Sequence, residues 1–278
     1  MKKINRRSFL AAAGLTAAAL ALTACGGSAS STASSTASSA ASSEAASTSA
    51  AAELTTVEAG KLTMATNAAF PPYEMTTDAG EFEGIDIDTA KAIAEKLGLE
   101  LQIDDMDFDA ALLSVQQGKA DIVMAGVTVT DERKAVMDFS DSYATGIQSI
   151  IVPEGSDITS PDDLAGKKIG TQRGTTGYIY CSDDFGDENV VAYDDGLTAV
   201  QALNNGQVDA VVIDNAPAKE FVAANPGLVI LDTSYAEEDY AIGLAKGSAL
   251  EDAVNAALEE LKADGTLQSI VDKYINAE

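Results

Sequence analysis

The chain has 278 residues, with 17 Lys and Arg against 44 Asp and Glu, no His, and a net charge of −27. This balance argues against nucleic-acid binding, because a polyanionic partner would be repelled over most of the surface. With no His and only two Cys, the chain has no candidate for a His-based catalytic triad, a Cys₄ zinc site or a disulfide framework, so no metal and no cofactor are expected.

The N-terminus has the pattern of an export signal. The basic residues Lys2, Lys3, Arg6 and Arg7 precede an apolar stretch, 9–24, that is too short to span a bilayer comfortably. The stretch ends in Leu22-Thr-Ala-Cys25-Gly, which resembles a bacterial lipobox. We therefore predict a lipoprotein signal peptide at 1–24 and a lipid such as palmitate on Cys25. Residues 6–10 also resemble a twin-arginine signal, so the export route stays open. The alternative is that Cys25 is an ordinary small residue of the signal.

A polar segment separates this signal from the rest of the chain. Residues 28–52 are almost entirely Ser, Ala and Thr, so residues 25–57 are predicted to be a disordered tether between membrane and domain. Without the four basic residues of the signal, 13 basic and 44 acidic residues remain, a net charge of −31. Only two of these basic residues, Arg133 and Arg173, are arginines. Cys181 is expected to be a buried small residue, and a reactive thiol is the less favoured alternative.

From residue 61 onward, short apolar segments alternate with segments of helical periodicity. The predicted elements, in chain order, are a strand at 61–66, a helix at 86–97 ended by Gly98, a helix from Phe108 ended by Gly118, strands at 121–125 and 168–170, a helix from Thr175, a helix at 196–205, a strand at 209–213, and helices at 249–263 and 266–274. This alternation predicts an α/β fold of parallel sheets with helices on both faces.

One part of this pattern occurs twice. Residues 114–125 and 201–213 both read as helix, Gly, two residues, Asp and buried strand, with Gly118 and Gly206 separated by 88 positions (206 − 118). The simplest explanation is two similar α/β lobes, whose strands open at their carboxyl ends on a ligand-binding crevice. The alternative is that such units recur by chance in an α/β protein.

Residues after the first of these strands suit a carboxylate. Thr130 is a good N-cap, so Arg133 is expected one turn into a helix that starts at the end of the strand. An arginine fork can hold a carboxylate through two parallel hydrogen bonds, and Thr128 can add a hydroxyl and a backbone N–H. The alternative is a surface arginine paired with Asp131 or another nearby acid.

The second half supplies candidates for the other end of a dipolar ligand. Asp214 ends the strand at 209–213 and can accept from an ammonium group; the alternative is that it only caps the following helix. Residues 170–177 form a Gly-containing turn before a helix, and exposed N–H groups there attract anions, so this turn is a second donor set for the same carboxylate as Arg133. Phe70 and Phe108 are candidate walls of the site, although core packing is the usual role of a Phe.

Several linked motifs resemble the polar amino-acid-binding proteins of bacterial ABC transporters, the extracellular solute-binding proteins of family 3. The resemblance runs from about Lys61 to Tyr274, and its motifs are Thr66-Asn-Ala-Ala-Phe-Pro-Pro-Tyr73, Gly84-Ile-Asp-Ile-Asp88, Phe108-Asp109, Gly118-Lys-Ala-Asp121, Gly126-Val-Thr-Val-Thr-Asp-Glu-Arg133, Phe139-Ser-Asp-Ser-Tyr143, Gly174-Thr-Thr176 and Asp209-Ala-Val-Val-Ile-Asp214.

The resemblance implies a two-lobed, type II periplasmic-binding-protein-like fold. Each lobe would be a mostly parallel sheet flanked by helices, with two crossing hinge strands between them. The first lobe would comprise 58–145 and 241–278, and the second 146–240.

The resemblance also implies roles for individual residues. Arg133, Thr128 and the backbone at Thr176 would hold the ligand carboxylate, and Asp214 with the Gly126 carbonyl would hold the ammonium group. Phe70 and Phe108 would sandwich the side chain. The full set of predicted ligand-binding residues is Asn67, Phe70, Phe108, Ala125, Gly126, Thr128, Arg133, Gln172, Thr175, Thr176 and Asp214.

Side-chain specificity is expected near Asn67 and Gln172. Members of the family that take cationic side chains often carry an acid where this chain has Asn67, which favours a neutral polar ligand. Asp107 and Asp109 lie beside Phe108 and could restore a preference for cations.

The expected function is capture of a free polar L-amino acid and its delivery to an ABC transporter permease. The protein would be an exported monomer, anchored by lipid at the outer face of the cell membrane, and not an enzyme. Two alternatives remain open: a dehydratase of the prephenate or arogenate type on the same fold, with Glu74, Asp107 or Asp109 as general acid, and a lipid-anchored amino-acid sensor that needs a separate receptor.

Overall fold

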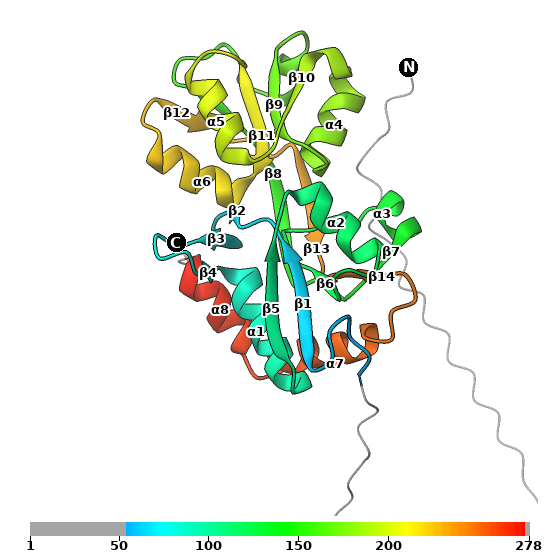
Figure 1. The fold of residues 1–278 in the computed structure, drawn as a ribbon. Coiled ribbons are helices and arrows are strands. Elements are labelled where there is room, and N and C mark those ends of the chain that lie inside the picture. The colour runs from blue at the N-terminus through cyan, green and yellow to red at the C-terminus, as the bar shows by residue number, and fades with distance from the viewer. Residues whose placement is uncertain (1–53, 276–278) are drawn as a thin grey trace, which may run out of the picture. The chain divides into compact units, whose positions relative to one another are not determined.

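The computed structural model describes residues 54–275, which lie within one compact unit, Ala50–Glu278. This unit contains two main sheets and a small third one (Figure 1). The predicted signal peptide, Cys25 and most of the predicted tether lie outside the described residues. Among residues 54–275, no helix is both long and apolar enough to cross a membrane.

The first sheet is built from both ends of the domain. Its strand order is β5 (Glu100–Asp105), β1 (Lys61–Thr66), β6 (Ile122–Val123), β14 (Gly243–Ala245) and β7 (Met137–Phe139). Strand β1 alternates between two apolar cores: Leu62 and Met64 pack in one, and Ala65 in the other. The helices of this half are α1 (Ile85–Leu97), α2 (Phe108–Gln116), α3 (Asp131–Val136), α7 (Glu251–Ala263) and α8 (Thr266–Tyr274).

Helices cover both faces of this sheet. Helix α1 packs against α7 and α8, and their apolar side chains share the core that contains Leu62 and Met64. Helix α2 packs against β1 and β14 and contributes Ala111 and Val115 to the core that contains Ala65. The small third sheet lies beside this half and has the order β2 (Ala69–Phe70), β3 (Glu74–Thr76) and β4 (Phe82–Glu83).

The second sheet repeats this arrangement. Its strand order is β10 (Val190–Tyr193), β9 (Ile169–Gln172), β11 (Ala210–Asp214), β8 (Ala144–Pro153) and β12 (Leu228–Ile230), and β13 (Ala236–Tyr240) also pairs with β8. Val211 and Val212, neighbours on β11, belong to different cores, as alternation along a strand covered on both faces requires. The helices are α4 (Thr176–Phe185), α5 (Gly196–Asn204) and α6 (Asn215–Ala224), with short 3₁₀ turns at Pro161–Leu164 and Asp187–Asn189.

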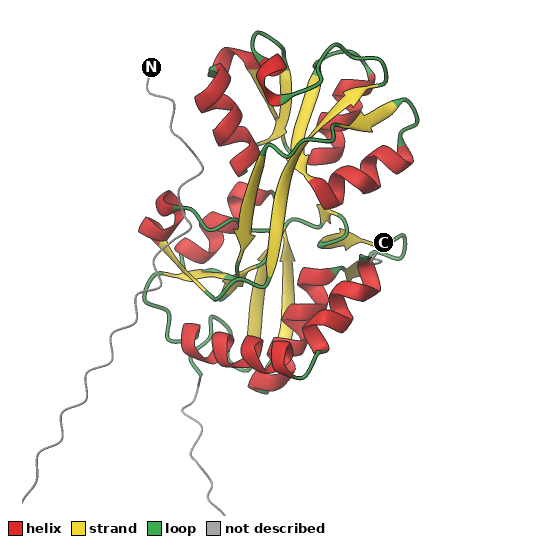
Figure 2. Ribbon diagram, turned by 180° about the vertical axis from the view of Figure 1, so that it is seen from behind, coloured by secondary structure: helices red, strands yellow, loops and turns green. Residues whose placement is uncertain are grey.

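Strands β8 and β13 connect the two halves. They pair antiparallel in the register Ala144↔Tyr240 through Gln148↔Ala236, and the far end of β8 continues into the second sheet beside β11. Both strands run between the two sheets, and the view from behind shows them side by side (Figure 2). The halves are therefore joined by one two-stranded ribbon.

The predicted alternation of strands and helices is confirmed, and the differences concern the pairing. Strand β6 has two residues rather than the five predicted at 121–125. Each sheet is mixed rather than parallel, because β14 and β8 pair antiparallel with their neighbours. Strand β8 is one of the two connections between the halves, and β14 directly follows the other, β13. Their direction is therefore set by the path of the chain between the halves and not by strand–helix–strand repetition.

The duplicated pattern has the same geometry in both halves. Gly118 and Gly206 follow α2 and α5 with φ of 66° and 67°, left-handed values that favour glycine. Asp121 then accepts the backbone N–H of Thr63 at 2.8 Å, and Asp209 accepts that of Lys168 at 2.8 Å. Each aspartate thus ties its own segment to the strand that lies next to it, which explains why the same spacing recurs.

The last residues of the predicted tether contact the domain. Leu54 packs against the core of the first half, and the Val57 N–H donates to Asp121 Oδ1 at 2.7 Å. Residues of the segment 54–57, which the sequence assigns to the tether, therefore contact the first half. The exact limits of the two lobes stay a prediction.

Candidate functional site

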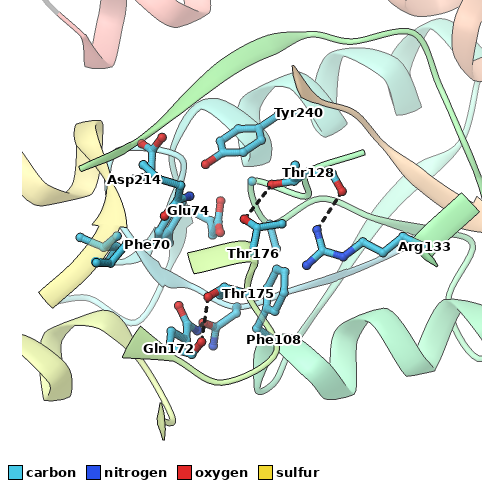
Figure 3. A pocket seen from close by; sticks show the side chains of 16 residues that line it. Phe70, Glu74, Phe108, Thr128, Arg133, Gln172, Thr175, Thr176, Asp214 and Tyr240 are labelled. Carbon is cyan, nitrogen blue, oxygen red and sulfur yellow. Dashed lines mark hydrogen bonds between the residues drawn. The ribbon is translucent and has the colours of Figure 1, made fainter. Parts of the chain in front are cut away.

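All eleven predicted ligand-binding residues line one cavity. They come from both halves of the domain, and Figure 3 shows how their side chains converge. The cavity has five further lining residues that were not among the predicted ligand-binding residues: Glu74, Gln148, Val212, Ile213 and Tyr240. Of these, Glu74 was considered only as a general acid of the alternative enzyme.

The ends of three strands supply most of this lining. Ala125, Gly126 and Thr128 follow β6, Gln172 ends β9, and Asp214 ends β11. Residues beyond the carboxyl ends of parallel strands converge at one edge of their sheet, so the topology gathers Gln172 with Asp214 in the second sheet and places the residues after β6 at the corresponding edge of the first. Gly126 has φ of 54°, and a Cβ there would stand 2.9 Å from the Phe70 ring. A side chain at this position would push the aromatic wall out of the cavity.

Arg133 is the cation of the site. The Thr130 hydroxyl caps α3 by accepting the Arg133 N–H at 3.2 Å, which fixes the first turn. The buried guanidinium, 8% exposed, donates to the Thr128 carbonyl at 2.8 Å and to the Gly174 carbonyl at 3.1 Å. It also lies 5.4 Å from the centre of the Phe108 ring. The alternative of a surface arginine is therefore wrong. A guanidinium has five N–H donors, so donors remain for a carboxylate.

Asp214 is the acid that faces the cavity from the other half. Its Oδ1 accepts the Ala216 N–H at 2.9 Å and caps α6, and its Oδ2 accepts the Ile147 N–H at 2.8 Å. Asp214 thus serves as a helix cap and lines the cavity at the same time. Burial raises its pKa to about 6, against the lowering effect of these two backbone donors. A carboxylate has about four acceptor positions, so it can accept from an ammonium group as well.

Two amides meet at another part of the cavity wall. Gln172 Nε2 donates to Asn67 Oδ1 at 2.8 Å and to the Asp194 carbonyl at 3.2 Å, and Asn67 Nδ2 donates to the Met106 carbonyl at 3.0 Å. Both N–H donors of Gln172 are thereby used, which leaves its carbonyl oxygen as an acceptor. Asp107 and Asp109, the acids expected to restore a preference for cations, are exposed beside this site.

A buried pair of carboxyl groups lies beside the cavity. Glu74, which lines it, is fully buried, and burial, followed by the charge of Asp86, raises its pKa well above the usual range. Burial raises the pKa of Asp86 to about 6, although the Gly126 N–H at 3.0 Å and the Tyr143 hydroxyl at 2.8 Å oppose the shift. Glu74 immediately follows Phe70-Pro-Pro-Tyr73, so its position beside a predicted site residue was a usable signal.

Cys181 and Arg173, which the sequence also brought to attention, do not line this cavity. Cys181 is fully buried in the core of the second half, which agrees with its expected role as a small buried residue. Arg173 is exposed and pairs with Asp194 at 3.2 Å. Within residues 54–275, no group of three or more His, Cys, Asp or Glu side chains is placed to hold a metal ion.

Comparison with known proteins identifies the family. Residues 62–277 match the model of the bacterial extracellular solute-binding proteins, family 3. The chain is 32% identical to the probable histidine-binding protein of Neisseria gonorrhoeae over 99% of the chain and 98% of that protein. It is 31% identical to ABC transporter arginine-binding protein 1 of Escherichia coli (strain K12), over 78% of the chain and 91% of that protein.

A solved structure gives the same result for the fold. An ancestral arginine-binding protein bound to glutamine superposes with a TM-score of 0.75 at 43% identity, over 78% of this chain and 99% of that one. This confirms the predicted type II periplasmic-binding-protein-like fold. These relatives are named as binding proteins, which supports the expectation that the chain is not an enzyme. The chain belongs to the bacterial extracellular solute-binding proteins of family 3.

Proposed function

We propose that this protein captures a free polar L-amino acid in the cavity between its two halves and delivers it to an ABC transporter permease. One observation carries the proposal: a buried guanidinium, Arg133, and a buried carboxylate, Asp214, line the same cavity from different halves of the domain. A free amino acid has one carboxylate and one ammonium group, so it matches both. The family and the relatives named for histidine and arginine support this ligand class.

Burial makes both ends of the ligand necessary. A molecule that lacks the ammonium group would leave Asp214 desolvated without a partner, and one that lacks the carboxylate would do the same to Arg133. Each unpaired charged group costs about 1–3 kcal/mol or more. We therefore expect a strict preference for free amino acids over the corresponding amines and simple acids.

Binding would also hold the two halves together. The Arg133 guanidinium already donates to Gly174 at 3.1 Å and Gln172 donates to Asn67 at 2.8 Å, so residues of both halves meet across the cavity. A ligand that bonds to Arg133 and Asp214 adds a further link between the halves. It stabilises the closed form by its difference in affinity for the closed and open states. The closed form would then dock on the permease.

A screen of amino acids by thermal shift tests the ligand class. A ligand at 100 times its dissociation constant adds about 2.7 kcal/mol of stability. At least one polar amino acid should raise the melting temperature of the full-length chain, and the Asp214→Asn variant should lose that shift. The exposed Asp239, changed to Asn, is the matched control and should keep it. The proposal fails if no amino acid stabilises the protein, or if the two variants respond equally.

Export and lipid anchoring belong to the same proposal. The lipobox-like sequence around Cys25 supports a lipoprotein held at the outer face of the membrane. Labelled palmitate should be incorporated into the wild-type protein in bacterial cells, and the protein should be found in the membrane fraction. Cys25→Ala should abolish both results; if it remains labelled and membrane-bound, Cys25 is not the anchor.

A further inference from the structure

Glu238 lies at the centre of a hydrogen-bond cluster beside the cavity. Its Oε2 accepts from the Thr128 hydroxyl, the Thr176 hydroxyl and Gln148 Nε2, each at 3.0 Å. The residue is 6% exposed, and its three partners all line the cavity. Glu238 therefore acts on the cavity through Thr128, Thr176 and Gln148.

Backbone hydrogen bonds fix this position. Glu238 lies on β13, which pairs with β8 on one side in the register Glu238↔Gly146. On the other side, the Val129 N–H donates to the Asp239 carbonyl at 3.0 Å, and Thr128 and Tyr240 form a bridge. The carboxylate is thus held between Thr128 and the second half by the main chain, so the cluster does not depend on a flexible loop.

The cluster determines which way the two hydroxyl groups point. A threonine hydroxyl has one hydrogen to donate and two lone pairs that accept. Thr128 and Thr176 both donate their only hydrogen to Glu238, and their oxygens approach each other to 3.4 Å. What these hydroxyls present to the cavity is therefore lone pairs. Lone pairs attract an ammonium group and repel a carboxylate.

We propose that Glu238 is a positioning residue for ligand binding: it accepts the hydrogen bonds of the Thr128 and Thr176 hydroxyls, so that the oxygens of these hydroxyls accept from the ligand's ammonium group. The ligand carboxylate is then left to the Arg133 guanidinium and to backbone N–H groups. The inference rests on the proposed function, because it requires a ligand with an ammonium group. It also reverses the expectation that the Thr128 hydroxyl donates to the carboxylate.

A purely structural role for Glu238 makes a different prediction. Glu238 also ties Thr128 of the first half to Gln148 and Thr176 of the second, so its loss could weaken the closed form for every ligand alike. The two roles are separated by the ratio of two affinities: that for an amino acid and that for its analogue without the α-amino group. A structural role changes both affinities by the same factor and leaves the ratio unchanged.

The experiment measures this ratio by calorimetry on the full-length chain. The probes are L-arginine, L-glutamine and L-histidine, each with its des-amino analogue. Glu238→Leu removes the acceptor, so the hydroxyls can turn and donate to the carboxylate that both probes share. We expect the ratio to fall at least tenfold, with the affinity for the analogue unchanged or higher. A ratio that stays within twofold of the wild-type value would overturn the inference.

Two further variants keep the test decisive if Glu238→Leu does not fold. Glu238→Gln keeps one acceptor oxygen but adds N–H donors that compete for the same hydroxyls, so the ratio should fall by about threefold; no change contradicts the inference. Thr128→Val removes the lone pairs, and it should weaken amino-acid binding roughly tenfold or more while leaving the des-amino analogue unaffected. An equal loss for both contradicts the inference.

A control and the wild-type result complete the design. Glu237, the exposed neighbour on the same strand, is changed to Gln as the matched control, and its ratio should equal that of the wild type. If the wild-type protein binds none of the three amino acids, the proposed function has failed for these ligands. If it binds one of them and the ratios do not move, only the assignment of Glu238 is wrong.

Discussion

The role of Arg133 gives the sharpest quantitative prediction. Replacement by Met keeps a long apolar side chain against Phe108 but removes the guanidinium, whose centre lies 5.4 Å from that ring. Two of its five N–H groups are engaged by the carbonyls of Thr128 and Gly174, so as many as three remain for a ligand. Because the site is buried, the carboxylate of a ligand bound to Arg133→Met would have neither the guanidinium nor water as a partner. Removing one partner of such a pair costs about 2–5 kcal/mol, a factor of 30 or more in the dissociation constant.

Titration calorimetry with an amino acid that stabilises the wild type measures this loss directly. Arg173 is the natural control, since it is the other arginine of the domain and its side chain is 53% exposed beside Asp194. Arg173→Met should change the dissociation constant less than twofold, because exposed ion pairs contribute little. Both variants should melt cooperatively without ligand. Unchanged affinity in Arg133→Met, or an equal loss in Arg173→Met, would refute the assignment of the carboxylate anchor.

Three other perturbations have defined outcomes. Binding that needs ionised Asp214, with its pKa of about 6, should weaken about tenfold between pH 7 and pH 5 in calorimetry; a flat profile argues against Asp214 as the ammonium anchor. Without ligand, the pH dependence of the free energy of unfolding has the opposite sign. Because the pKa of Asp214 is higher in the folded than in the unfolded protein, this residue contributes roughly 3 kcal/mol of stability below pH 4, and the contribution is lost as the pH rises through 6. Urea unfolding of wild type and Asp214→Asn should therefore show a smaller pH dependence in the variant, and equal slopes would contradict the burial effect. A Cβ at Gly146 would overlap the Tyr240 ring, so Gly146→Ala should lower the free energy of unfolding by about 1–3 kcal/mol, and an unchanged urea midpoint would contradict this. Asp121→Ala leaves the buried Thr63 N–H unpaired, removes the bond to the Val57 N–H, and should cost about 1–3 kcal/mol in the same assay, whereas a loss no greater than that of an exposed Asp→Ala control would show that these bonds contribute little.

The sequence predicted the site best where the site residues follow the ends of strands. The eleven predicted site residues, which the family resemblance supplied as a set, line one cavity, and most of them follow strand ends. The apolar segments of the sequence placed those ends only to within about two residues. Arg133 was found through its cap: Thr130 fixes the helix start, and the helix start fixes the direction of the guanidinium. The repeated Gly and Asp of the two halves likewise predicted a repeated structure before any family was considered.

The residues that were missed lie on strands whose pattern gives no signal. Gln148 and Glu238 belong to β8 and β13, the two connecting strands that the resemblance implied but that the sequence pattern did not locate. Strand β13 reads Ala-Glu-Glu-Asp-Tyr, an acidic segment typical of an exposed turn. Glu238 is buried only because β13 crosses beside Thr128, and this long-range packing cannot be read from local composition. Asn67 and Gln172 bond to each other across 105 positions for the same reason.

The ribbon formed by β8 and β13 also restricts how the two halves can move. A single strand would allow the second half to swivel freely, but two strands held in a five-residue antiparallel ladder cannot slide past each other without breaking main-chain hydrogen bonds. The remaining soft deformation is a bend or twist of the ladder as a unit. The two halves can therefore separate only by bending and twisting this ladder, and the intact ladder returns them to the same mutual alignment when they close again.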